Sequence, residues 1–259
     1  MPFANLPDVR IHYEFAGAEH LPVLVLSNCL GTNLTMWDSQ IEAFSQRFRI
    51  LRYDTRGLGQ SGVTPGPYTI GQLGWDVVGL LDALHLNRVH FCGLSMGGMT
   101  GMFLGANAPN RFHKLVLCNT AAKIGTAETW NARIQAVQNG GMKAVAASVI
   151  ERWLTPGFRS SHPVESQAVL AMLQAANPQG YMANCAAVRD TDQRKALSTI
   201  CVPCLVIAGT HDPAATPAEG RSLTKSISGA AYVELPTSHL SNIEARDEFN
   251  RQALQFLVA

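Results

Sequence analysis

The sequence predicts an α/β fold, with a mostly parallel central sheet flanked by helices and an inserted helical cap. Short apolar runs alternate with helical patterns over most of the 259 residues. From Pro22 onward most runs are continuously apolar, as is typical of parallel strands buried on both faces. The alternation stops once, across a long strandless stretch. These features together are typical of a doubly wound sheet with one insertion.

We expect strands at seven runs, which follow one another along the chain. They are Val9–Phe15, Pro22–Ser27, Phe48–Tyr53, Val89–Cys92, Lys114–Cys118, Cys204–Ala208 and Ala231–Leu235. Helical patterns lie between several of these runs, at Thr35–Ser45, Ile70–Leu84, Ser95–Ala108 and Glu244–Leu257.

The strandless stretch extends from about Thr120 to Lys195. We expect four helical segments in it, separated by Gly140-Gly141, Pro156-Gly157 and Pro178-Gln-Gly180. We interpret residues 121–194 as a cap over the active site, and residues 1–120 and 195–259 as the core. An ordinary helical extension is the alternative, but this length within an alternating pattern favours a cap.

The charge pattern argues against several classes of partner. The formal net charge is +1 and no block is rich in Lys or Arg, so we expect no nucleic acid and no anionic membrane as partners. The N-terminal residues lack a basic segment followed by an apolar stretch, and no apolar run is long enough to span a bilayer. We therefore expect a cytoplasmic protein.

The cysteines fit the same compartment. Cys92, Cys118 and Cys204 lie inside apolar runs, which predicts buried free thiols. The pair Cys201-x-x-Cys204 has no second pair to accompany it, so we expect neither a metal site nor a redox site there.

The most informative motif is Gly93-Leu-Ser95-Met-Gly97. An apolar run leads into it, and a pattern of small residues typical of a closely packed helix follows. This context predicts a strand, a sharp turn and a helix, with Ser95 exposed at the carboxyl edge of the sheet. A serine with only a structural role in a turn is the alternative, but the context favours a nucleophile.

A serine nucleophile needs a base, and the base needs an acid that fixes its tautomer. On this architecture the chain order is serine, acid, histidine. Asp212 follows the penultimate strand-like run and is the expected acid, whereas His239 follows the last run and is the expected base. The preceding run ends at Asn119 and Thr120, which are not carboxylates. His211 comes too early in the chain to be the base, which leaves it at most a supporting role beside the acid.

Gly57-Leu-Gly59-Gln-Ser-Gly62 matches the dinucleotide-binding fingerprint, but that fingerprint requires a helix to begin there. Pro65 and Pro67 follow instead and prevent the helix. We interpret this segment as a turn that supports the edge of the active site, and we expect no nucleotide cofactor.

With these residues in place, the whole chain resembles the α/β-hydrolase superfamily, and it is most similar to the 3-oxoadipate enol-lactonases. Two phrases carry the narrower resemblance, Ser27-Asn-Cys-Leu-Gly-Thr32 and Ser238-His-Leu-Ser-Asn-Ile-Glu244. Further phrases support it, at Met36-Trp-Asp38, Leu51-Arg-Tyr-Asp-Thr-Arg-Gly57 and Pro65-Gly-Pro-Tyr-Thr-Ile70.

The resemblance implies hydrolysis of 3-oxoadipate enol-lactone to 3-oxoadipate, a step of aromatic catabolism. Ser95 would attack the lactone carbonyl, His239 would accept its proton and Asp212 would orient His239. No metal and no organic cofactor are implied.

An oxyanion hole needs two backbone N–H groups aimed at the developing negative charge. Met96 follows the nucleophile and is expected to supply one. Alignment with the family assigns the other to Cys29, or to Leu30 if the loop is shifted by one residue.

The implied substrate is a small anionic lactone, so we expect a mostly apolar pocket with one matched cation. The candidates in the cap are Arg133, Arg152, Arg159 and Arg189. Trp130 and Arg133 share one helical face near the start of the cap, because they are three residues apart. We expect Arg133 to bind the carboxylate with Trp130 packed beside it. A solvated arginine and a core tryptophan are the alternative.

Two other functions stay open. The chain could be another serine hydrolase of this fold, such as a carboxylesterase, a C–C bond hydrolase of ring-cleavage products or a cofactor-free haloperoxidase-like esterase. It could also be a ligand-binding member that keeps the fold as a receptor. The presence of Ser95, Asp212 and His239 together argues against a receptor.

Overall fold

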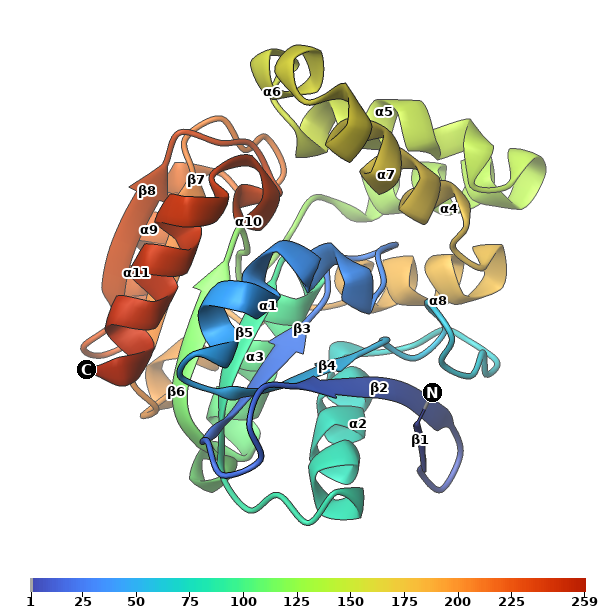
Figure 1. The fold of residues 1–259 in the computed structure, drawn as a ribbon. Helices are drawn as coiled ribbons and strands as arrows, with labels where there is room; N and C mark the ends of the chain where they lie inside the picture. The colour runs from blue at the N-terminus through green and yellow to red at the C-terminus, as the bar shows by residue number, and fades with distance from the viewer. Residues whose placement is uncertain (1) are drawn as a thin grey trace.

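A single eight-stranded sheet runs through the molecule, in the order β1-β2-β4-β3-β5-β6-β7-β8 (Figure 1). The computed structural model describes residues 2–259. The strands are β1 Phe3–Asn5, β2 Arg10–Ala16, β3 Val23–Ser27, β4 Arg49–Tyr53, β5 Val89–Leu94, β6 Phe112–Cys118, β7 Cys204–Gly209 and β8 Ala231–Leu235. β2 is antiparallel to both β1 and β4, whereas the other neighbouring pairs are parallel. The predicted fold class is therefore confirmed.

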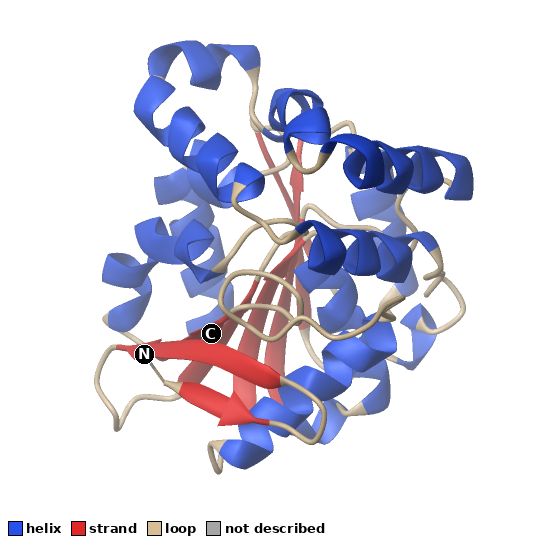
Figure 2. Cartoon of the chain, turned by 90° about the vertical axis from the view of Figure 1, so that its right-hand side faces the viewer, coloured by secondary structure: helices blue, strands red, loops and turns tan. Residues whose placement is uncertain are grey.

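Helices cover both faces of this sheet (Figures 1 and 2). The core helices are α1 Asp38–Ser45, α2 Ile70–Ala83, α3 Met96–Asn107, α9 Pro217–Ser226, α10 Ser241–Glu244 and α11 Arg246–Val258. α1 packs with α11 on one face of the sheet, and α2 packs with α3 on the opposite face. The central strands are buried because of this double cover, and every residue of β7 is buried.

The sequence prediction missed some details of the core. The edge strand β1 was not expected, because three residues are too few to carry a periodic pattern. The helix expected over Thr35–Ser45 is divided between the 3₁₀ turn η1 (Leu34–Trp37) and α1. The helix expected from Glu244 begins at Arg246, since the backbone of Ala245 leaves the helical region between α10 and α11.

The strandless stretch between β6 and β7 is a helical insert (Figure 1). Its helices are α4 Ala127–Gly140, α5 Lys143–Trp153, α6 Pro156–Ser161, α7 Pro163–Gln174 and α8 Pro178–Arg189. The sequence predicted one segment fewer. The extra division lies at His162, whose non-helical backbone precedes the Pro163 that starts α7.

The last helix of the insert is held closely against the core. A Cβ on Gly180 would lie 1.8 Å from the carbonyl oxygen of Gly57, so only glycine allows this approach. Four residues later, Asn184 donates from Nδ2 to the carbonyl oxygen of Arg56 at 2.8 Å. The Gly57 turn therefore supports the insert.

Within residues 2–259, no helix has both the length and the apolar character needed to cross a membrane.

Candidate active site

Ser95 stands at the junction of β5 and α3 in a strained backbone conformation, with φ +58° and ψ −113°. Its N–H donates to the carbonyl oxygen of Cys118 at 2.8 Å, which fixes the turn against β6. A Cβ on Gly93 would lie 2.2 Å from the carbonyl oxygen of Gly97, and a Cβ on Gly97 would lie 2.2 Å from that of Ser27. The two glycines are therefore needed for this turn.

Asp212 and His239 come from loops after the last two strands, and His239 lines the same cavity as Ser95. Nδ1 of His239 lies 2.7 Å from Oδ2 of Asp212, and both side chains are buried. Oδ1 of Asp212 accepts hydrogen bonds from the N–H groups of Ala214 at 2.8 Å and Ala215 at 3.1 Å. His211, next to the acid, is exposed, and its N–H donates to Thr237.

The charges of this pair stabilise each other. Burial by itself raises the pKa of Asp212, but His239 and the two backbone N–H groups outweigh burial and hold that pKa below its ordinary value. Burial by itself lowers the pKa of His239, but the charge of Asp212 and its hydrogen bond raise that pKa above 6.5. The imidazole is thus a stronger base than a free histidine.

Met96, which follows Ser95 in the chain, and Cys29, which follows β3, are the two residues expected to supply oxyanion donors. Met96 is the first residue of α3, so no helical carbonyl lies one turn before its N–H. Cys29 lines the same cavity as Ser95, but its N–H donates to Sδ of Met36 at 3.3 Å. Leu30, the alternative donor, also lines the cavity.

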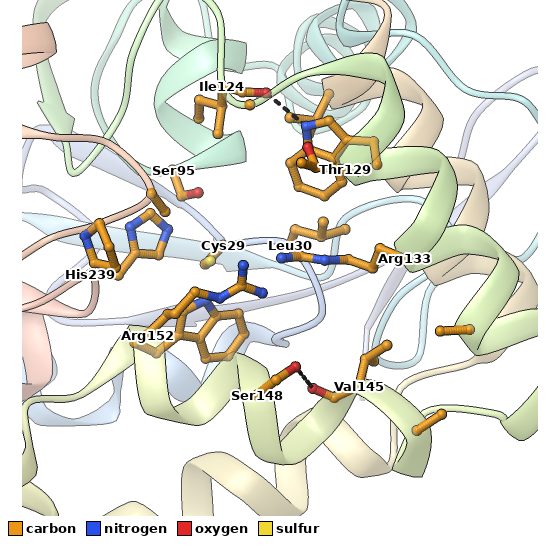
Figure 3. Close-up of a pocket in the computed structure, with 18 residues that line it drawn as sticks. Cys29, Leu30, Ser95, Ile124, Thr129, Arg133, Val145, Ser148, Arg152 and His239 are labelled. Carbon is orange, nitrogen blue, oxygen red and sulfur yellow. Dashed lines mark hydrogen bonds between the residues drawn. The ribbon is translucent and has the colours of Figure 1, made fainter.

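Ser95 and His239 open into a cavity of about 470 Å³ between the sheet edge and helices α4 and α5 (Figure 3). Its wall is mostly apolar, and of the described residues that line it none is an aspartate or glutamate. The remaining lining residues are Cys29, Leu30, Ile124, Gly125, Thr129, Trp130, Arg133, Ala136, Ala144, Val145, Ser148, Arg152, Trp153, Val188, Pro213 and Ala214.

Of the four candidate arginines, Arg133 and Arg152 line the cavity and Arg159 and Arg189 do not. The guanidinium carbon of Arg133 lies 4.6 Å from the centre of the Trp130 ring, a cation–π contact. Nε1 of Trp130 donates to the carbonyl oxygen of Ile124 at 2.7 Å, which fixes the ring. Arg189 is instead bonded to Asp190.

The model of the alpha/beta hydrolase fold family matches residues 22–245. The chain belongs to the α/β-hydrolase family. This hydrolase is 42% identical to 3-oxoadipate enol-lactonase 2 of Acinetobacter baylyi over 94% of this chain and 91% of that protein. It is 40% identical to 3-oxoadipate enol-lactonase 1 of the same organism, over 95% and 92% of the two chains.

A solved structure agrees with these relatives. The enol-lactonase from Burkholderia xenovorans superposes on this hydrolase with a TM-score of 0.98 and 46% identity, and the match covers all of both chains. The resemblance to enol-lactonases that the sequence motifs indicate is thereby confirmed.

Two residues of this hydrolase that the sequence did not single out hold the site in place. Asn119, at the end of β6, donates to Oδ2 of Asp212 at 3.2 Å and to the carbonyl oxygen of Ser238 at 3.0 Å. Glu244 accepts from the N–H of Thr155 at 2.8 Å with one carboxylate oxygen and from the N–H of Ser238 at 2.5 Å with the other. In the sequence, the position of Asn119 after an apolar run and the Ser238–Glu244 phrase were the available signals, and neither identifies a partner.

The part of the chain that the structure describes contains no cluster of three or more His, Cys, Asp or Glu side chains able to hold a metal ion.

The Gly57–Gly62 segment packs closely against Asp54, so that a Cβ on Gly59 would lie only 2.2 Å from the Asp54 carboxyl carbon. No helix begins there, and α2 starts only at Ile70.

Proposed function

We infer that this protein is a 3-oxoadipate enol-lactonase, which opens 3-oxoadipate enol-lactone to 3-oxoadipate with Ser95 as nucleophile. The observation that carries this function is the composition of one cavity. A strained serine and an Asp-paired histidine occupy one wall, guanidinium groups occupy another, and no carboxylate of the described chain lines it. The identity of 42% and 46% to two enol-lactonases, over nearly the full length of the chain, supports the same substrate.

Acylation begins when Oγ of Ser95 attacks the lactone carbonyl while Nε2 of His239 accepts the serine proton. Asp212 stabilises the imidazolium that forms and keeps its Nδ1 proton in place. The N–H groups of Met96 and Cys29 stabilise the oxyanion. The N–H of Cys29 gives up its hydrogen bond to the Met36 sulfur and donates to the oxyanion instead. The intermediate then collapses, the ring C–O bond breaks, and the leaving enolate oxygen takes the proton from His239, which returns that histidine to its neutral form.

Deacylation follows the same path with water. His239 accepts a proton from the water molecule as its oxygen attacks the acyl carbon. Collapse of the second intermediate breaks the bond to Oγ of Ser95, which recovers its proton from His239. The new carboxylic acid ionises, and the enol of the opened ring converts to the ketone.

Arg133 pairs with the carboxylate that the lactone carries, and Trp130 holds the guanidinium by its ring face. Residues 121–194 act as the cap that closes this pocket above Ser95. The enzyme acts on a small anion in the cytoplasm, a compartment that fits the six free cysteines.

The decisive experiment is a spectrophotometric assay on freshly generated enol-lactone, with p-nitrophenyl acetate as a neutral reference ester. We expect rapid loss of the lactone and much slower turnover of the reference. Turnover of the reference without turnover of the lactone would indicate another esterase of this fold. Turnover of neither would indicate a ligand-binding member.

A further inference from the structure

The cavity holds two positive charges, only one of which the proposed reaction uses. Arg133 comes from α4 and Arg152 from the last turn of α5, and both side chains point into the cavity in Figure 3. Across residues 2–259, neither guanidinium is in an ion pair with an aspartate or glutamate. Arg189, outside the cavity, has Asp190 as its partner.

The two guanidinium groups lie close enough to affect each other. Burial and the charge of Arg133 both lower the pKa of Arg152. An arginine nevertheless stays protonated at neutral pH, so the repulsion persists. An anion between the two groups would relieve it, and the cavity wall offers none of its own from the described residues.

Arg152 is the arginine whose backbone is joined to the reacting centre. Oγ of Ser238 donates to the carbonyl oxygen of Arg152 at 2.5 Å, and the N–H of Leu240 donates to that of Trp153 at 3.1 Å. These two bonds flank His239. Arg133, by contrast, is held by Trp130 on α4.

Hydrolysis changes the charge of the ligand. The lactone carries one carboxylate, and a second forms at the carbonyl carbon that was bonded to Ser95. We propose that the cavity is a dicarboxylate site, in which Arg133 binds the carboxylate of the substrate and Arg152 binds the carboxylate that the reaction creates. This inference rests on the proposed function for the identity of the product, and it makes six-carbon dicarboxylates inhibitors of the enzyme.

Adipate tests the proposal, because it has the chain length of the product and does not react. Its inhibition constant is measured against hydrolysis of p-nitrophenyl acetate and compared with that of monomethyl adipate. We expect competitive inhibition, with adipate binding about tenfold more tightly than its ester, since only adipate engages both arginines. Arg152→Gln removes most of this preference, whereas Arg152→Lys retains part of it.

Arg189→Gln is the matched control, because this cap arginine lies outside the cavity, and it keeps the full preference for adipate. Circular dichroism of each variant establishes that it is folded. Equal inhibition by adipate and its ester in the wild type would overturn the proposal, and so would an undiminished preference in folded Arg152→Gln.

The assay of lactone hydrolysis tests the proposed function independently of this inhibition experiment. A preference for adipate without lactone turnover refutes the proposed function alone, and turnover without the preference refutes the dicarboxylate site alone.

Discussion

Nδ2 of Asn119 donates to the same carboxylate oxygen of Asp212 that pairs with Nδ1 of His239, at 3.2 Å and 2.7 Å respectively. Asn119 is itself fixed, because its Oδ1 accepts from Oγ of Ser241 at 2.5 Å. The acid is thus held from two sides, by the backbone after β7 and by a side chain at the end of β6.

We expect Asn119→Ala to lower kcat roughly 10- to 100-fold, because a hydrogen bond to a charged group contributes about 1.5–3 kcal/mol. KM changes less, since Asn119 does not line the cavity. Steady-state kinetics on the enol-lactone provide the measurement. Asn107→Ala is the control, because Asn107 is exposed and bonds only within α3. Equal losses in the two variants would refute a role for Asn119 in holding Asp212.

Ser95→Ala is expected to reduce turnover on the order of 10⁴–10⁶-fold without loss of the fold. Ser95→Gly is also inactive but unfolds at a higher denaturant concentration than Ser95→Ala, because glycine tolerates φ +58° and ψ −113° without strain. We expect a gain of about 1–2 kcal/mol in the free energy of unfolding. Activity within tenfold of the wild type in either variant would rule out Ser95 as nucleophile.

The rate should rise with pH, since His239 must be neutral to accept the serine proton. Asp212 stabilises the protonated imidazole and raises the pKa of His239, so the midpoint of the acidic limb of kcat/KM lies above 6.5. Asp212→Asn removes that charge and lowers the pKa, as a titration of His239 followed by NMR would detect. A pKa that is unchanged or higher in Asp212→Asn contradicts this account of the pair.

Arg133→Ala should lower kcat/KM for the anionic lactone, with a loss of about 2–5 kcal/mol in transition-state stabilisation. A loss of this size is typical when one partner of a desolvated charge pair is removed. The value of kcat/KM for the neutral p-nitrophenyl acetate falls much less, because this ester has no carboxylate to pair with Arg133. The ratio of the two values of kcat/KM is the measurement, and Arg189→Ala is the control. Equal losses on both substrates would mean that Arg133 has only a structural role.

Glu244 joins the insert to the loop that carries His239. Glu244→Gln keeps the size of the side chain but replaces one carboxylate oxygen with an NH₂ group, which is a donor. The variant can therefore accept from the N–H of Thr155 or from that of Ser238, but not from both. We expect a lower melting temperature and a roughly tenfold lower kcat, and Glu248→Gln on the exposed side of α11 is the control. A lower melting temperature with kcat unchanged would limit Glu244 to a structural role.

The core of the fold could be predicted because its strands are continuous apolar runs and because the turn at Ser95 requires glycines on both sides. Gly93 and Gly97 have no room for a side chain, so the motif around Ser95 carries its own geometry. The short edge strand and the division of the insert at His162 could not be predicted, since both depend on a few residues without periodicity.

By itself, the sequence determined the fold class, the family and the order of Ser95, Asp212 and His239 along the chain. The fold class and the turn at Ser95 follow from local spacing, because strand periodicity and turn sterics act between near neighbours. The family follows from the resemblance of short sequence phrases. Only the tertiary structure decided which arginines face the cavity and what holds the acid. Arg133 and Arg152 have the same chemistry as Arg159 and Arg189, and their exposure to one pocket depends on how α4 and α5 pack. The contacts of Asn119 with Asp212 and of Glu244 with Thr155 join segments about 90 residues apart, a distance at which no local pattern in the sequence specifies a partner.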